Sequence, residues 1–208
     1  MNWRWERWAG LAGVAYVLLS VGVFALGVEV GPSDREILEY YADSGNREKE
    51  TVAFFVISAA ALAFVLFASA VRSLIAAAEG PPVTLAAIAW AGATAYSALT
   101  LAGNAVSRAT AFAAMDTDVF ELDVNSRRLL EDAGLLLLAS GAIAAILFVV
   151  SASIAAVRHG ILPRWLGWAG FVVAAVLPLA VGFIGFLALF LWVLLVSSVL
   201  AIRRTTTA

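Results

Sequence analysis

The longest uncharged stretch of the chain lies near its carboxyl end, where the 38 residues 165–202 include no acidic or basic side chain. As a single helix this stretch would be about 57 Å long, and a hydrocarbon core about 30 Å thick would force it to tilt by about 60°. Spanning helices tilt by about 0–40°. We therefore predict two helices joined by a reversal at 179–185, where Pro178 closely precedes Gly182 and Gly185.

The composition of the chain is that of a membrane protein. Hydrophobic residues occupy 63% of the 208 positions and the mean hydropathy is +0.96, whereas soluble domains are about 45–50% apolar. Four further uncharged runs are each long enough for one span of about 20 residues and too short for two: 8–28, 51–71, 80–107 and 133–157. The absence of cysteine excludes disulfides, thiol catalysis and thiolate metal sites.

These runs predict an all-α fold, a polytopic transmembrane helical bundle that forms a single domain over residues 1–208. We expect six spans, at about 8–29, 51–72, 82–107, 132–157, 164–180 and 184–202. The first run also has features of a secretory signal peptide, because Arg4 and Arg7 precede it. Its 21 uncharged residues exceed the apolar core of about 7–15 residues usual in signal peptides, so we favour a retained span.

The charged residues predict an orientation for this bundle. With a cytoplasmic amino terminus, the inner segments carry seven arginines and two glutamates, a net charge of +5. The outer segments, 29–50 and 108–132, carry thirteen acidic and six basic residues, a net charge of −7. Because basic residues favour the cytoplasmic side, we predict a multi-pass protein of the cytoplasmic membrane with both termini in the cytoplasm.

A short sequence pattern recurs at the start of two predicted spans. Residues 4–10 and 164–170 both read R-W-x-x-W-A-G, so spans 1 and 5 begin alike and enter from the same face. A basic anchor followed by interfacial tryptophans explains the pattern without any further role.

The first outer segment predicts a short extracytoplasmic amphipathic helix between spans 1 and 2. Ser33 stands three residues before Glu36, the spacing of a capping box, and an apolar stripe follows, formed by Ile37, Leu38, Tyr40 and Tyr41. We expect the helix to lie on the membrane surface or to cap the bundle, and its two tyrosines to be structural or to contact a ligand. The second outer segment alternates Phe120, Leu122 and Val124 with acidic residues, a strand-like or interfacial pattern.

Several kinds of chemistry are disfavoured by the residues available. The single histidine, His159, and the single lysine, Lys49, lie outside the spans, and the central thirds of the spans carry no ionisable side chain. Proton relays and ion-coupled transport depend on such groups. The acidic residues 116–123 lack the glycine and the terminal glutamate of a calcium loop. We expect no catalytic residues, no metal site and no cofactor.

One polar strip crosses the outer half of the third span. It consists of Ser97, Thr100, Asn104, Ser107 and Arg108, at spacings of three and four residues. Glu131 and Asp132 open the fourth span and Glu50 the second, and we predict that Arg108 pairs with Asp132 or, failing that, with Glu131. The strip either joins helices or lines an outward-facing pocket for a small polar or amphipathic ligand. The candidate ligand-binding residues are Asn104, Arg108, Asp132, Glu131, Tyr40 and Tyr41.

Three sequence blocks carry a resemblance that covers nearly the whole chain. They are AGLAG at 9–13, after a basic and aromatic amino terminus, EYYA at 39–42, and LPRWLGW at 162–168. In this order they resemble a family of uncharacterised bacterial six-helix integral membrane proteins, a domain of unknown function. The resemblance implies a fold and a bacterial inner-membrane location, but no reaction and no site residues.

Three functions are compatible with these features. We favour an integral membrane protein without catalytic activity, which acts as a binding or accessory subunit through its acidic outer face. Its partners would be membrane lipids and either a partner membrane protein or a second copy of the chain, and no nucleic acid. The alternatives are a small-molecule or lipid permease with an outward-facing polar pocket, and an enzyme acting on lipid-linked substrates through Asp132, Glu131 or Glu50.

Overall fold

The computed structural model describes residues 3–27, 30–116 and 121–202. Within these ranges the chain is all-α, as predicted, and no strand occurs. The elements are α1 (Trp3–Gly22), the 3-10 helix η1 (Val23–Leu26), α2 (Asp34–Ala42), α3 (Ser44–Glu79), α4 (Thr84–Ala113), α5 (Val124–His159), α6 (Arg164–Val176), the 3-10 helix η2 (Leu177–Gly182) and α7 (Ile184–Ile202).

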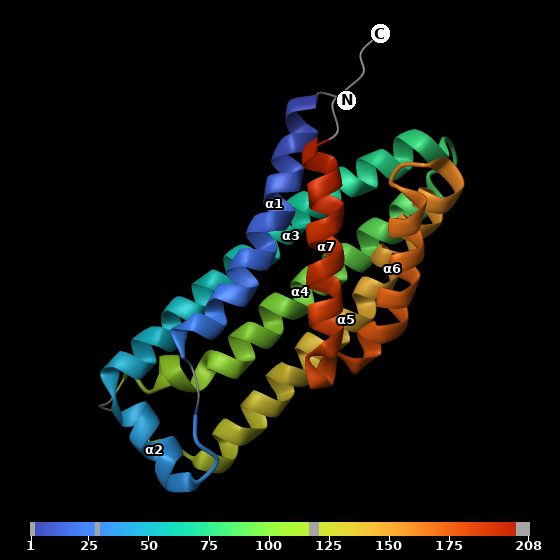
Figure 1. The fold of residues 1–208 in the computed structure, drawn as a ribbon. Coiled ribbons are helices and arrows are strands. Elements are labelled where there is room, and N and C mark those ends of the chain that lie inside the picture. The colour runs from blue at the N-terminus through green and yellow to red at the C-terminus, as the bar shows by residue number, and fades with distance from the viewer. Residues whose placement is uncertain (1–2, 28–29, 117–120, 203–208) are drawn as a thin grey trace.

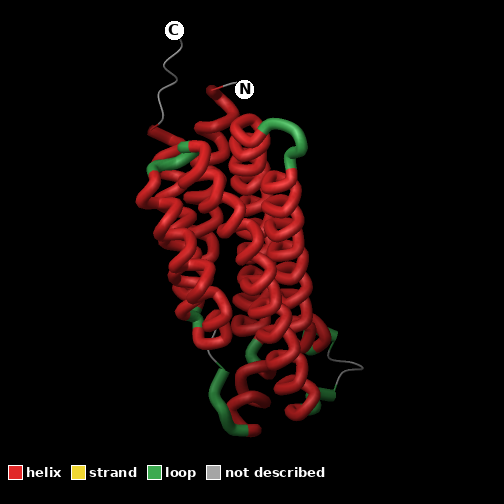
Figure 2. Tube along the Cα trace, turned by 90° about the vertical axis from the view of Figure 1, so that its right-hand side faces the viewer, coloured by secondary structure: helices red, strands yellow, loops and turns green. Residues whose placement is uncertain are grey.

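The helices form one bundle whose connections gather at its two ends (Figures 1 and 2). One end, here called the α2 end, is built from α2, the starts of α3 and α5 and the end of α4. At the other, here called the α6 end, α1 and α6 begin and α7 ends, beside the α3–α4 and α5–α6 connections (Figure 1). The beginning of α1 and the end of α7 therefore lie at the same end of the bundle.

Four helices within the described ranges are long and apolar enough to cross a membrane, namely α3, α4, α5 and α7. Two shorter apolar segments, Gly10–Leu26 and Arg164–Ala180, complete the set. The chain is therefore a multi-pass membrane protein by helix length and hydropathy. At 36 residues each, α3 and α5 are about 54 Å long, well beyond a hydrocarbon core of about 30 Å. Their charged first turns extend them at the α2 end, which is why both helices start earlier than the spans predicted at 51 and 132.

The reversal predicted at 179–185 is confirmed. Helix α6 ends at Val176, η2 follows with Pro178 in its first turn, and Phe183 turns the chain with a positive φ of 65° before α7 begins. A Cβ atom on Gly185 would lie 2.8 Å from the carbonyl oxygen of Leu177. Only glycine permits this close approach of two backbones. The surroundings of Gly182 lie outside the described residues.

The main core contains a cluster of aromatic side chains from five helices. Phe64 and Phe67 of α3, Phe148 of α5 and Trp192 of α7 are among its fully buried side chains. The hydroxyl groups of Tyr16 in α1 and Tyr96 in α4 lie 2.6 Å apart and hydrogen-bond within this core. Trp192 donates its indole N–H to the carbonyl oxygen of Leu166 at 3.2 Å. Each polar group that these aromatic residues bring into the core thus has a partner.

Of the two interpretations of the alternation around residue 122, strand-like or interfacial, the strand is not formed by the described residues. Residues 121–123 have no regular structure and Val124 opens α5, where Asp123 caps the helix by accepting from the backbone amides of Asn125 and Ser126. The alternating apolar residues Leu122 and Val124 instead pack beneath α2. Phe120, the third residue of the pattern, lies outside the described residues.

Candidate functional site at the α2 end

Helix α2 begins with the capping box that its sequence predicts. The amide of Glu36 donates to the Ser33 hydroxyl at 3.3 Å, and the amide of Ser33 donates to the Glu36 carboxylate at 3.0 Å. Hydrogen bonds from Ser33 lower the pKa of Glu36, because they stabilise its ionised form. The cap gives this nine-residue helix a defined start.

The predicted apolar stripe of α2 divides between two faces. Ile37 and Tyr41 are only 1% and 3% exposed and pack against Ala111 and Ala114 near the end of α4. Tyr40 is half-buried, whereas Leu38 points away from the bundle. Of the two placements expected for this helix, the structure therefore shows the cap over the bundle (Figure 1).

A buried ion pair joins α3 and α4 beneath α2. The guanidinium of Arg108 contacts the carboxylate of Glu50, and the two side chains are only 12% and 6% exposed. The hydroxyl of Tyr40 donates to the same carboxylate at 3.4 Å. Because both charges are largely removed from water, each depends on the other for its solvation.

The predicted pairing of Arg108 with Asp132 or Glu131 is therefore wrong. Helix α3 begins at Ser44, six residues before Glu50, so Glu50 faces the neighbouring helix instead of marking its end. Helix α5 likewise begins at Val124, which places Glu131 one turn after Arg127, and these two side chains form an ion pair along the helix. Asp132 is exposed and pairs with no basic side chain within the described ranges.

Asn104 extends the network one turn further into the bundle. Its side-chain oxygen accepts from Nε of Arg108 at 3.1 Å, and its amide nitrogen donates to the carbonyl oxygen of Phe54 at 2.9 Å. With 2% of its surface exposed, Asn104 lines no open pocket. Of the two interpretations of the polar strip, this part favours the joining of helices.

The deeper part of the strip is also enclosed. Ser107 donates its hydroxyl to the carbonyl oxygen of Gly103 at 2.9 Å, within α4. Ser97 and Thr100 are buried, and among the described residues their hydroxyl oxygens have no hydrogen-bond partner. The strip therefore runs from a saturated network at the α2 end to two unpaired hydroxyls in the core.

Two arginines of α5 hold α2 from the other side. Arg127 is buried, donates from Nε to the Tyr41 hydroxyl at 3.4 Å, and places its guanidinium 5.8 Å from the centre of the Tyr41 ring. Arg128 donates to the carboxylate of Asp34 at 2.7 Å and to the carbonyl oxygen of Pro32 at 2.9 Å. Sequence reasoning missed both residues as part of the site. The four-residue spacing of Arg127 and Glu131 was the available signal.

The structure thus divides the six predicted site residues into three groups. Tyr40 and Arg108 contact Glu50, and Asn104 contacts Arg108. Tyr41 and Glu131 both contact Arg127, and Asp132 stands apart. Burial, and to a smaller extent the neighbouring Tyr41, raises the pKa of Tyr40, so its phenol is neutral at physiological pH and donates to Glu50.

The charges at the α2 end are sorted by sign. Its six bases all contact polar groups of the chain: four arginines form ion pairs, Arg47 donates to the carbonyl oxygens of Tyr41 and Ala42, and Lys49 donates to the Asn46 side chain. Several acidic side chains are exposed and have no ion-pair partner in the described part of the chain: Asp43, Glu48, Asp116, Glu121, Asp123 and Asp132. The surface that this end presents to its surroundings is therefore acidic.

Among the described residues, no group of three or more acidic or histidine side chains is placed to hold a metal ion. Comparison with protein-family models, with curated proteins and with solved structures finds no match to this chain. The family resemblance of the three sequence blocks thus gains no support from these comparisons. The chain is a helical, multi-pass membrane protein, and at its α2 end ion pairs and hydrogen bonds hold helix α2 over the bundle.

Proposed function

We propose that this membrane protein is a non-catalytic binding or accessory subunit that docks a basic segment of a partner membrane protein on the acidic surface of its α2 end. The observation that carries the proposal is the sorting of charge at this end. Its arginines are engaged in contacts within the chain, two of them exposed, while several of its carboxylates are exposed and have no ion-pair partner in the described residues. Such a surface attracts and orients positively charged partners.

The rigidity of the surface supports this role. Helix α2 is fixed by its capping box, by the burial of Ile37 and Tyr41, and by the contacts of Arg127 and Arg128. Because these contacts fix the helix beside the carboxylates before any partner arrives, little conformational entropy of α2 is lost on binding. The saturated network around Asn104 and Arg108 also speaks for a binding subunit over a permease that opens at this point.

The proposal includes a topology. We propose that α1 with η1, and α6 with η2, also cross the bilayer, giving six crossings with both chain ends in the cytoplasm. This arrangement is supported by the positions of α1 and α7, because α1 begins and α7 ends at the same end of the bundle (Figure 1). The α2 end would then face away from the cytoplasm.

The test is photo-crosslinking in native membranes from a probe amino acid at position 125, beside the acidic surface. We expect a discrete adduct whose partner peptide, read by mass spectrometry, contains a basic segment. Neutralising the surface with Glu48→Gln, Glu121→Gln and Asp132→Asn should lower the adduct yield at least about fivefold, the factor that corresponds to about 1 kcal/mol.

The matched control removes bases from the same face. Arg35→Gln with Lys49→Gln changes two exposed side chains and makes the face more negative, so the adduct yield should stay equal or rise. An adduct yield that does not fall when the three carboxylates are neutralised, or a partner peptide without basic residues, would overturn the proposal.

A further inference from the structure

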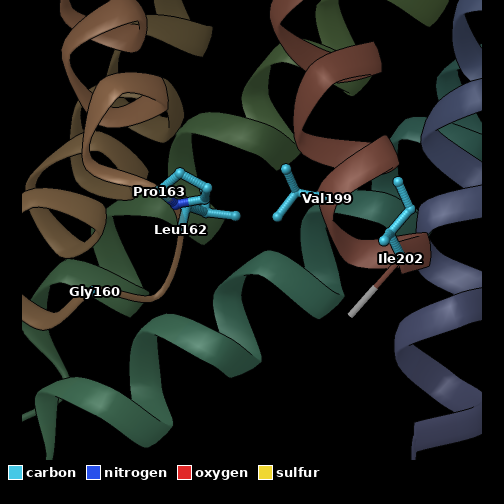
Figure 3. A pocket seen from close by; sticks show the side chains of 5 residues that line it. All are labelled: Gly160, Leu162, Pro163, Val199 and Ile202. Atoms are coloured by element: carbon cyan, nitrogen blue, oxygen red, sulfur yellow. The ribbon is translucent and has the colours of Figure 1, made fainter. Parts of the chain in front are cut away.

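An apolar hollow lies at the α6 end of the bundle, far from the acidic surface. It is lined by Gly160, Leu162 and Pro163 of the α5–α6 connection and by Val199 and Ile202 in the last turn of α7, and it is an open depression with a volume of about 410 Å³. Figure 3 shows Leu162 and Val199 pointing toward one another across it. No side chain that lines the hollow carries a charge.

Basic side chains flank the hollow along the chain. Arg158 and His159 directly precede Gly160, Arg164 directly follows Pro163, and all three are exposed. Gly160 ends α5 with a positive φ of 66°. The last turn of α5 and the first turn of α6 therefore flank the same short loop. Within the described ranges, no carboxylate lies within ion-pair distance of either arginine.

The acidic side chain described at this end is already occupied. The carboxylate of Glu79 accepts from the backbone amide of Leu85 at 2.9 Å and from that of Ala86 at 3.2 Å, where it caps the start of α4. The hollow is thus an apolar surface beside basic groups that lack an anionic partner in the described part of the chain.

Two tryptophans indicate the depth of the hollow in the membrane. Trp165 and Trp168 begin α6, lie three residues apart on one face of the helix, and are 56% and 62% exposed. Exposed tryptophan is enriched where the hydrocarbon core meets the headgroup layer. These tryptophans favour a position of the α5–α6 loop at the level of lipid phosphates.

We propose that this hollow binds one anionic phospholipid. Its acyl chain packs against Leu162, Pro163 and Val199, and its phosphate accepts charge-assisted hydrogen bonds from Arg158 and Arg164. The planar guanidinium groups suit bidentate recognition of phosphate oxygens. Basic pockets between membrane helices recognise anionic headgroups in this way. The site is independent of the proposed partner surface at the α2 end.

The test is native mass spectrometry of the full chain in detergent, titrated with dioleoyl-phosphatidylglycerol or with dioleoyl-phosphatidylcholine, which has the same chains and no net charge. We expect one molecule of the anionic lipid to be retained. Its affinity should exceed that of the zwitterionic lipid by a factor of up to about 30, the effect of two basic side chains near an anionic headgroup. Glycerol 1-phosphate, a headgroup without chains, should not bind.

Arg158→Gln with Arg164→Gln should bring the anionic lipid to the level of the zwitterionic one. The control, Arg35→Gln with Lys49→Gln, removes two positive charges at the α2 end and should leave the preference unchanged. Val199→Trp, which fills the hollow and keeps both arginines, should abolish retention, and it decides the matter if the double variant does not fold. Equal retention of both lipids by the unaltered chain, retention by Val199→Trp, or binding of glycerol 1-phosphate alone overturns the proposal.

Discussion

The two ends of the bundle are held together by different physical means. At the α2 end, side chains far apart in the sequence join helices through charge: Arg108 with Glu50, and Arg128 with Asp34. At the α6 end, short connections close the helices through backbone geometry, with positive φ angles at Gly80 and Gly160. The α2 end therefore depends on a few charged contacts, whereas the α6 end depends on the chain path itself.

The largest effect expected from this comparison is all-or-none. If the two ends face opposite sides of the membrane, single cysteines in this cysteine-free chain should react differently with an impermeant thiol reagent in intact cells. We expect Ser44→Cys and Ser126→Cys at the α2 end to be labelled, and Thr206→Cys to be protected until the membrane is opened. Labelling of Thr206→Cys in intact cells would contradict the six-crossing topology.

The next effect concerns the buried ion pair. Arg108→Ala leaves the Glu50 carboxylate without its partner, which should lower the free energy of unfolding by about 3–5 kcal/mol. Thermal unfolding in detergent measures the loss. The exchanged pair, Arg108→Glu with Glu50→Arg, should recover part of it. A loss from Arg108→Ala as small as that of an exposed arginine would show that this end is not held by charge.

A smaller effect is expected at the α6 end. Glu79→Ala removes the cap from the amides of Leu85 and Ala86, and side-chain caps contribute about 0.5–2 kcal/mol. The matched control is Glu48→Ala, an exposed glutamate of the same helix, which should change the free energy of unfolding by less than about 0.5 kcal/mol. Equal free energies of unfolding for the two variants would show that the Glu79 cap does not stabilise this end.

The smallest effect should come from the exposed pair at the α2 end. Arg35 and Glu39 lie one turn apart, with side chains 86% and 61% exposed, so Arg35→Ala should cost about 0.3–0.5 kcal/mol. The same unfolding assay compares it with Arg108→Ala. A cost above about 1 kcal/mol would show that the burial of an ion pair does not determine its contribution to stability at this end.

Features set by local sequence were predictable here. The capping box of Ser33 and Glu36 and the reversal near Pro178 depend on neighbouring residues, and both are present. The partner of Arg108 was not predictable in the same way. It depends on where α3 begins and on which way Glu50 faces. The uncharged run begins after Glu50, so it does not indicate that the helix already starts six residues before Glu50. Hydropathy locates the part of a helix within lipid but not the turns that extend beyond it.

The separation in sequence of the residues that hold α2 also has a consequence in time. Arg128 and Asp34 lie 94 residues apart, so the ribosome needs about 5–20 s after Asp34 to deliver Arg128, at about 5–20 residues per second. Until Ala111 and Ala114 are made, Ile37 and Tyr41 have no apolar surface of α4 to cover them. The cap therefore closes only after α3, α4 and the start of α5 have been made, while residues 129–208 are still to be synthesised when Arg128 is added.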